Sequence, residues 1–420
     1  MTTAPAATNS SYRDVLRRDR RVTGLLLGDL LAQAGTGMLI VAMPVQTLAV
    51  HGSVPAAVAI GLVEAAPFLL STVLALAISL GRFPAPPRLL LLADCVLRAV
   101  TFTGLGLLAV TGRLTLPLLI GGLLLGSVFR MAGSSSRRLL ATSMVGEADR
   151  FAVNGLLGVG GNFALLVLGP VAGGLLVASA GAGWALFADA CGALILLAAV
   201  LWCAPRSPAP APAREGDKPR SESGWRILRR RPVAARLLVV VFFFNFLYMP
   251  IEVALPLYVR ETLHTGASGL GLLWTALGVG ALVGAAVVDR LRNLPQRPLL
   301  ITIVALWALC PIALAGIGNQ AAAMVAFGIG GLIWAPFTPV AYSFLQSGLS
   351  PEEQQPVVTL WTTGSTVAAP LGLLAGGPLV AAAGTHPSLI LSGVLTLLLA
   401  PLAAWSVLTA RDPGQGAAGV

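Results

Sequence analysis

Apolar residues along this chain gather in long blocks that short polar segments separate. Each block holds about 20 residues or more, which is enough for one α-helix to cross the ~30 Å hydrocarbon layer of a bilayer. We therefore predict an all-α polytopic membrane protein with twelve transmembrane helices. Their predicted ranges are 22–49, 55–79, 89–111, 115–136, 152–178, 182–203, 235–259, 267–289, 298–317, 320–343, 356–383 and 386–409.

The segment 204–234 differs from the apolar blocks, because it is rich in Pro, Ala and Arg and shows no periodicity. This composition is typical of a flexible linker. The linker separates an N-terminal six-helix bundle at 22–203 from a C-terminal six-helix bundle at 235–409. We expect residues 1–21 and 410–420 to form cytoplasmic tails.

The two predicted bundles are similar in sequence. LGPVAGGLLVASAG (168–181) matches LGLLAGGPLVAAAG (371–384) at ten of fourteen positions, with an offset of 203 residues. VAMP (41–44), near the end of the first span, matches VALP (253–256), near the end of the seventh, with an offset of 212 residues. Parallel repeats of this kind build transporters whose substrate site lies near mid-membrane, between two halves. The sequence therefore predicts two pseudo-symmetric six-helix bundles.

Basic residues are distributed unevenly, and their distribution predicts the orientation of the chain. Of the 27 Lys and Arg residues, 23 fall in the tails, the linker and the loops on the same side of the membrane. Loops rich in Lys and Arg face the cytoplasm, so we expect both termini to be cytoplasmic. The same bias accounts for the net charge of +10, which leaves no reason to expect a nucleic-acid partner.

The composition excludes several classes of protein. Charged residues make up 10% of the chain, whereas a soluble domain averages about 25%. The three histidines, His51, His264 and His386, fall in short external loops, where we expect solvated side chains and no metal site. Apart from His386 at the first position of the last span, the spans hold no histidine, and the chain has no phosphate-binding loop of the P-loop type. We therefore expect neither an enzyme nor an ATP-driven pump, and no cofactor.

Two predicted helices carry polar residues on one face. In the first span, Asp29, Gln33 and Thr36 are spaced i, i+4 and i+7, which aligns them. The corresponding stripe of the seventh span is Asn245, Tyr248 and Glu252. Because these helices are equivalent in the repeat, the stripes predict one shared substrate cavity; separate interhelical hydrogen bonds are the alternative. The candidate cavity residues are Gln33, Thr36, Asn245, Tyr248 and Trp334, of which Trp334 could instead face lipid.

Ionisable residues inside the spans need an explanation, because each charge at the bilayer centre costs about 2.5–3.5 kcal/mol on insertion scales. A buried carboxyl group can change its protonation state near physiological pH, which makes it a candidate proton carrier. We favour Asp29 and Glu252, although Glu252 could instead be a structural hydrogen-bond partner. We expect Asp94 to pair locally with Arg98 at i+4, and Asp189 to lie near the membrane interface. The candidate proton-coupling residues are Asp29, Glu252, Glu64, Asp189 and Arg130.

Several motifs are similar to those of one large transporter family. LGPVAGG in the fifth span resembles the fifth-helix signature of proton-coupled antiporters, and VVDRL resembles a cytoplasmic loop motif. Together with the duplication, they resemble the major facilitator superfamily over essentially the whole chain. The segments LADCVLRA, RRLLATSMV and IEVALPLYVRETL are similar to the branch with macrolide-efflux and enterobactin-exporter-like proteins. The motif residues, to which we assign structural and gating roles, are Asp94, Arg98, Gly169, Pro170, Gly173, Gly174, Asp289 and Arg290.

This resemblance implies a monomeric secondary transporter in the bacterial cytoplasmic membrane, surrounded by lipid. It would export a small amphiphilic or apolar compound in exchange for protons. Uptake symport, passive facilitation and lipid flipping by the same fold are the alternatives. Arg130 resembles a fourth-helix arginine implicated in proton coupling. The acid-containing turn usual in the first span of this branch is replaced by Gly35-Thr36-Gly37, with Asp29 two turns earlier, so the resemblance does not fix the proton site.

Overall fold

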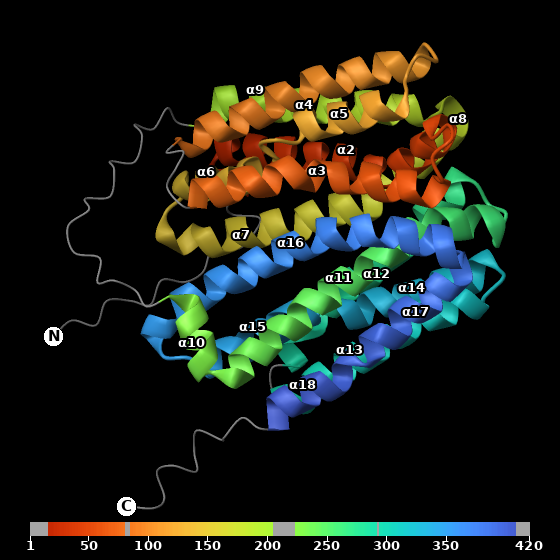
Figure 1. The fold of residues 1–420 in the computed structure, drawn as a ribbon. Helices are drawn as coiled ribbons and strands as arrows, with labels where there is room; N and C mark the ends of the chain where they lie inside the picture. The colour runs from red at the N-terminus through yellow and green to blue at the C-terminus, as the bar shows by residue number, and fades with distance from the viewer. Residues whose placement is uncertain (1–15, 80–84, 205–222, 292–293, 409–420) are drawn as a thin grey trace, which may run out of the picture. The chain divides into compact units, whose positions relative to one another are not determined.

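The computed structural model describes residues 16–79, 85–204, 223–291 and 294–408. Every regular element in these residues is a helix, so the predicted all-α class is confirmed (Figure 1). The chain divides into two compact units. The first consists of Met1–Arg214 and Thr265–Gly278, and the second of Glu215–His264 and Val279–Val420.

The first unit is formed mainly by the N-terminal half of the chain. Its helices are α2 (Arg20–Val50), α3 (Ala56–Ser79), α4 (Pro87–Val110), α5 (Leu116–Gly126), α6 (Arg130–Ser143), α7 (Glu147–Phe163), the π-helical turn η1 (Ala164–Leu168), α8 (Gly169–Ala180) and α9 (Ala182–Cys203). α12 (Ala267–Leu291) contributes residues to both units.

The second unit is formed by the C-terminal half. Its helices are α10 (Gly224–Arg230), α11 (Pro232–Glu261), α13 (Gln296–Gly316), α14 (Gln320–Trp334), α15 (Phe337–Ser347), α16 (Pro351–Ala383), α17 (Thr385–Leu397) and α18 (Leu399–Leu408). Among the described residues of both units, twelve helical segments are long and apolar enough to cross a membrane, which confirms the predicted number of spans.

Four spans are interrupted, where the apolar pattern predicted a single regular helix. They are formed by α5 with α6, α7 with α8, α14 with α15, and α17 with α18. Proline accounts for three of these interruptions, because it lacks the N–H that continues the helical hydrogen bonds. Pro170 follows the π-helical turn η1, Pro336 separates α14 from α15, and Pro401 lies in the first turn of α18.

Part of the predicted linker is helical. α10 lies within 204–234, whereas residues 205–222 of that segment lie outside the described residues. Ile227 and Leu228 of α10 are buried, and α10 packs against the first turns of α16 (Figure 1). Gly224 permits this approach, since a Cβ there would lie 2.8 Å from the carbonyl oxygen of Pro356. α10 is thus an exception to the irregular structure expected for this segment.

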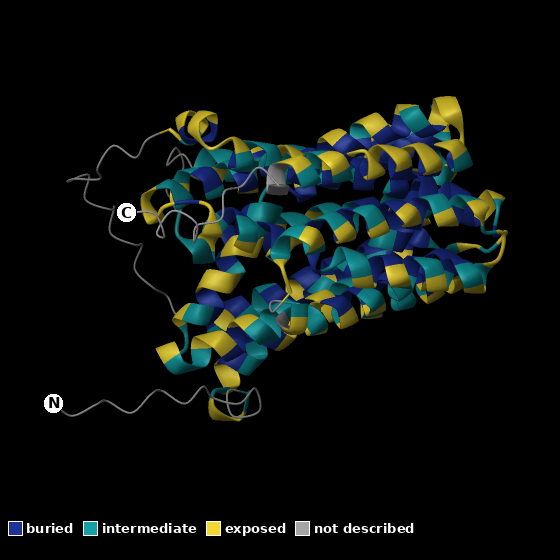
Figure 2. Cartoon of the chain, turned by 90° about the horizontal axis from the view of Figure 1, so that it is seen from below, coloured by how far each residue is buried: buried dark blue, intermediate teal, exposed yellow. Residues whose placement is uncertain are grey.

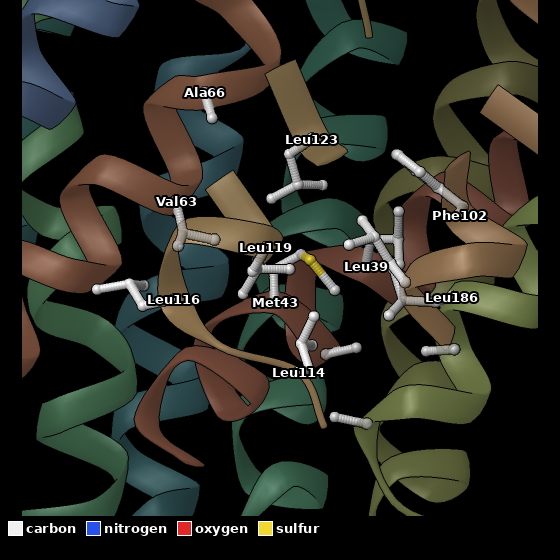
Figure 3. Packing of buried hydrophobic residues seen from close by; sticks show 14 of the residues in the cluster. Leu39, Met43, Val63, Ala66, Phe102, Leu114, Leu116, Leu119, Leu123 and Leu186 are labelled. Carbon is white, nitrogen blue, oxygen red and sulfur yellow. The ribbon is translucent and has the colours of Figure 1, made fainter. Parts of the chain in front are cut away.

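An apolar core of the first unit forms where α2, α3, α4, α5 and α9 meet. Figure 3 shows Leu119 of α5 beside Met43 of α2, within the same cluster as Phe102 of α4 and Leu186 of α9. Leu119 and Leu186 have no exposed surface. Because α2 is packed by its neighbours along this stretch, the polar residues that it carries elsewhere are held in fixed positions.

Large apolar side chains also cover the outer faces of the helices. Val100 of α4 is 67% exposed and Trp202 of α9 is 85% exposed. Figure 2 shows exposed residues along the helices as well as in the loops. Soluble proteins rarely expose apolar surface of this extent, whereas lipid chains are as apolar as leucine and solvate it well. The surface therefore agrees with a protein that crosses the membrane many times.

The two halves use the same glycine contacts between equivalent helices. In the first unit, a Cβ on Gly173 of α8 would lie 2.7 Å from the Cα of Met38 on α2. In the second unit, a Cβ on Gly376 of α16 would lie 2.9 Å from the Cα of Pro250 on α11. The two glycines are 203 residues apart and their partners are 212 residues apart, as in the sequence repeat. The duplication therefore includes the backbone contacts that set helix spacing.

The helices that carry these glycines also end in the same way. Gly181 after α8 has a φ of 98°, and Gly384 after α16 has a φ of 88°. Their N–H groups donate to the carbonyl oxygens of Val177 and Val380, at 3.0 and 2.9 Å. A positive φ favours glycine because it has no Cβ. The same turn is therefore required at both positions of the repeat.

We expect Gly173→Val and Gly376→Val to destabilise the protein, because each added side chain would force two helix backbones apart. Overpacking of this kind costs about 1–3 kcal/mol. Gly104→Val in α4 is the control, since a Cβ there meets no heavy atom within 4 Å. Thermal unfolding of the purified variants in detergent measures the effect. Equal midpoints for all three variants would contradict the proposed packing role.

Candidate functional site

A buried ion pair lies on the polar face of α2. The Asp29 carboxylate is 2.6 Å from the guanidinium of Arg137 on α6, and their side chains are 5% and 14% exposed. Arg137 also donates a hydrogen bond of 3.5 Å to Gln33 Oε1, one turn along α2 from Asp29. On the adjacent helix α7, a Cβ on Gly161 would lie 3.7 Å from Gln33 Nε2. Three helices therefore bring two opposite charges and an amide together.

This ion pair forms part of the wall of a cavity of about 570 Å³. The lining residues come from α2, α6 and α7, and they are Asp29, Gln33, Ser134, Ser135, Arg137, Arg138, Leu139, Leu157, Gly158, Gly161 and Asn162. Its volume lies within the range of pockets that bind drug-sized molecules. Most of the lining residues are polar, so a molecule in the cavity would meet hydroxyl, amide and charged groups beside apolar surface.

A second ion pair joins α4 to α9. Arg98 Nε donates a hydrogen bond of 2.6 Å to the Asp189 carboxylate, whose side chain has no exposed surface. The same guanidinium donates to the carbonyl oxygen of Ala32 at 3.3 Å and to the Thr36 hydroxyl. Thr36 in turn donates to Asp189 at 3.3 Å. This cluster therefore connects α2, α4 and α9, and it places Thr36 beside an ion pair.

One sequence expectation is corrected by this cluster. The i, i+4 spacing predicts that Arg98 pairs with Asp94, whereas its guanidinium extends across to Asp189 on the tightly packed helix α9. Asp189, the partner that Arg98 contacts instead, has a completely buried side chain. The physical reason is electrostatic. A fully enclosed carboxylate needs an opposite charge, and the long Arg98 side chain can supply it from the neighbouring helix.

Asp94 lies one turn before Arg98 and is 7% exposed. It packs against α6, where a Cβ on Gly133 would lie 2.7 Å from Asp94 Oδ2. Within the described residues, Asp94 Oδ1 has no hydrogen-bond partner. Arg130 is close enough for its charge to act on Asp94, but its guanidinium lies over the ring of Phe68, 4.8 Å from the ring centroid. The first unit thus contains buried charged groups beyond the Asp29–Arg137 and Arg98–Asp189 pairs.

The predicted polar stripe of α11 has its own contacts in the second unit. Tyr248 stacks on Trp334 of α14, with ring centroids 5.9 Å apart. Tyr248 also shares a hydrogen bond with the carboxylate of Glu252, one turn further along α11. Asn245 donates a hydrogen bond of 2.8 Å to the carbonyl oxygen of Val241 in its own helix. Trp334 is therefore in contact with α11 and does not only face lipid.

The remaining predicted residues lie in separate places. Glu64 is half-buried on α3, and Arg290 is exposed near the end of α12. Asp289 belongs to α12, but its side chain lies outside the described residues. The motif residues of α8 are all buried: Gly169, Pro170, Gly173 and Gly174.

Arg137 is the residue that sequence reasoning missed. The predicted fourth span ends at 136, which assigned Arg137 to a cytoplasmic loop, whereas α6 continues to Ser143. A signal was available, because Arg130, Ser134 and Arg137 are spaced i, i+4 and i+7. This is the spacing that identified the stripe on α2. A polar stripe on the fourth span would therefore have predicted a partner for Asp29.

We expect Asp189→Leu alone to destabilise the protein strongly, because it leaves the buried Arg98 charge without its partner. Breaking a buried pair from one side costs about 3–5 kcal/mol. The double variant Arg98→Leu, Asp189→Leu removes both charges and should recover much of that loss. A double-mutant cycle on thermal unfolding in detergent measures the coupling. Additive effects of the two single substitutions would contradict a strong ion pair.

The chain matches the family model described as Major Facilitator Superfamily over residues 25–355 and 251–419. It is 27% identical over 397 residues to the multidrug efflux pump Tap of Mycolicibacterium fortuitum, covering 90% of this chain and 94% of that protein. It is 26% identical over 241 residues to the enterobactin exporter EntS of Shigella flexneri, covering 56% of this chain and 57% of that protein.

Two solved structures share the fold. The nucleoside transporter NupG matches with a TM-score of 0.71 and 12% identity, covering 94% of this chain and 100% of that one. A bacterial homologue of the human lysosomal transporter Spinster, in an inward-facing and unoccupied conformation, matches with a TM-score of 0.70 and 15% identity, covering 96% of this chain and 99% of that one.

Proposed function

Because this chain belongs to the Major Facilitator Superfamily, we propose that it is a secondary transporter that exports a small amphiphilic or apolar compound in exchange for protons. The similarity to a multidrug efflux pump and to a siderophore exporter supports export as the direction. The polar cavity of the first unit supports a small molecule as the substrate. On this proposal the protein moves its substrate without changing it chemically.

The Asp29–Arg137 pair in the cavity wall is the observation that carries the proposal. With Asp29 ionised, the two charges cancel. A proton on Asp29 would remove the negative charge and leave the cavity with one more positive charge. A cationic amphiphile would then bind less well, because Arg137 and Arg138 both line the cavity. Substrate and proton would therefore compete for the same place, as antiport requires.

This competition can drive transport only if it changes the balance between conformations. A ligand shifts a conformational equilibrium by its difference in affinity for the two states. The Asp29–Arg137 pair joins α2 to α6, so its protonation would loosen one helix contact as well as change the charge of the cavity. We infer that proton binding and substrate release are coupled through this contact, with reciprocal effects on both affinities.

Other buried polar groups fit secondary roles in the same scheme. Glu252, hydrogen-bonded to Tyr248, is the candidate second proton site. Tyr248, Trp334 and Asn245 are candidates for contact with the substrate's apolar parts and polar groups. Asp189 and Arg98 hold α4 and α9 together, which suits a structural role better than the proton-carrying role expected for Asp189. For Glu64 and Arg130 we retain a role in proton coupling.

The proposed location is the bacterial cytoplasmic membrane, with both termini in the cytoplasm. The distribution of Lys and Arg supports this orientation, since most of them precede or follow spans on the same side. Arg137 lies in α6 and not in a loop. The number of basic residues on the proposed cytoplasmic side therefore falls by one, which leaves the orientation unchanged. We propose that one chain is sufficient for transport.

We expect Asp29→Asn to abolish export driven by a proton gradient, because an amide side chain does not change its charge by gaining or losing a proton near physiological pH. The variant should still bind substrate weakly, as the protonated wild type would. Export from proteoliposomes with an imposed pH gradient should fall by about tenfold or more. Asp149→Asn is the matched control, since Asp149 pairs with Arg18 at 3.5 Å outside the cavity.

Full gradient-driven export by the Asp29→Asn variant would remove Asp29 from the coupling scheme. If the rate of export by the wild type does not depend on the imposed pH gradient, a passive facilitator is favoured instead. Gradient-driven accumulation inside right-side-out vesicles would favour uptake symport. The first two outcomes are read from the same proteoliposomes, and the third needs right-side-out membrane vesicles.

The orientation can be tested by cysteine labelling of intact cells. In a background in which the four native cysteines are replaced, Ser223→Cys should react with a membrane-impermeant maleimide only after the cells are opened. Ser53→Cys, in an exposed loop between α2 and α3, should react in intact cells. Labelling of Ser223→Cys from outside would overturn the proposed orientation.

A further inference from the structure

A second cavity lies in the second unit, between α10, α11 and α16, and has a volume of about 660 Å³. Its walls are mainly apolar and aromatic. The residues that define it are Trp225 and Leu228 of α10, Leu238 and Phe242 of α11, and Leu360 and Trp361 of α16. Neither Asp nor Glu is among the described residues that line it. We call this cavity the α10 groove.

The α10 groove exists because small residues face it from α16. Gly364 lines the groove, and a Cβ on Gly364 would meet no heavy atom within 4 Å. On the opposite wall, Val239 and Phe243 of α11 are each 42% exposed. The space is therefore open and apolar, and a flexible hydrocarbon chain could fill it without displacing any side chain.

Positive charge lies at one end of the α10 groove. Arg229 of α10 lines the groove, and Arg226 and Arg230 on the same short helix are exposed. Trp225, at the start of α10, is 68% exposed. Tryptophan is enriched at the level of lipid headgroups, and clustered basic residues beside a membrane attract anionic lipids. An apolar groove that ends in arginines complements a molecule with an apolar tail and an anionic head.

We propose that the α10 groove binds an anionic phospholipid of the surrounding bilayer. One acyl chain occupies the space between Phe242, Trp361 and Gly364, and the phosphate lies against Arg229 and its neighbours on α10. A neutral apolar molecule would gain nothing from these arginines, and a soluble anion would gain nothing from the aromatic walls. The occupant would hold α10 against α11 and α16. This site is separate from the cavity that contains Asp29 and does not depend on the proposed transport activity.

The test uses the full-length protein purified in detergent. Binding of phosphatidylglycerol and of phosphatidylcholine with identical acyl chains is measured by native mass spectrometry over a range of lipid concentrations. We expect the wild type to bind one phosphatidylglycerol more tightly than phosphatidylcholine. Thermal unfolding without added lipid, run beside it, identifies any variant that fails to fold.

Two variants separate the parts of the site. Arg229→Gln should weaken phosphatidylglycerol binding by about fivefold, the effect of one basic residue near a lipid surface, and should leave phosphatidylcholine binding unchanged. Gly364→Leu should weaken binding of both lipids, because its side chain fills the groove. Arg113→Gln, at an exposed position outside the groove, and Gly104→Leu are the matched controls and should bind both lipids as the wild type does.

The proposal is overturned if the wild type binds the two lipids equally, or if folded Gly364→Leu protein binds phosphatidylglycerol as the wild type does. A loss of phosphatidylglycerol binding in Arg113→Gln as large as in Arg229→Gln would also overturn it, because attraction would then depend only on net charge. If a transported dye displaces phosphatidylcholine and binds independently of Arg229, the groove is a substrate site, and the lipid proposal fails. None of these outcomes bears on proton-driven export.

Discussion

The cost of placing charge in the hydrocarbon layer is the constraint on which the first unit depends. At about 2.5–3.5 kcal/mol per residue on insertion scales, Asp29 and Asp189 must be partnered, and Arg137 and Arg98 partner them from other helices. Each ion pair therefore both neutralises a buried charge and holds two helices together. A pair that can lose its negative charge to a proton is also a contact that can be switched, which is what a coupled transporter needs.

Most of the fold could be predicted from the sequence, because the length and composition of an apolar block are sufficient to identify a membrane-spanning helix. The interruptions of the spans could not. Pro170 and Pro336 lie within apolar blocks, and proline is common in transmembrane helices, where neighbouring helices and waters satisfy the freed backbone groups. Proline therefore does not reveal whether a helix bends or ends. Whether a helix bends or ends depends on how it packs against neighbouring helices, and a hydropathy pattern contains no information about that packing.

The candidate site was predictable in part, for a related reason. Spacing along one helix identifies which residues share a face. Asp29 and Gln33 of α2 both line the cavity, whereas Thr36 belongs to the Arg98–Asp189 cluster. Spacing does not identify the helix that this face meets. The spacing therefore predicted that Arg98 pairs with Asp94, the nearest acid in its own helix. In the structure Arg98 pairs with Asp189 of α9. Arg137 escaped notice because the predicted fourth span ended at residue 136, whereas α6 continues to Ser143. Spacing along the sequence shows which pairs are possible, and the packing of helices against one another determines which pair forms.

The duplication preserved the scaffold and allowed the chemistry of the two halves to diverge. Gly173 and Gly376 make equivalent helix contacts, and Gln33 and Asn245 keep an amide at equivalent positions. Asp29, however, corresponds to Val241 at the same offset of 212 residues. The first unit thus concentrates its charges, whereas α11 presents Tyr248, stacked on Trp334. An antiporter needs one group whose charge changes and one surface that accepts an apolar solute. In the proposed antiport, Asp29 would be the first of these within its own half, and Tyr248 with Trp334 would be the second within the other half, where Glu252 is the candidate second proton site.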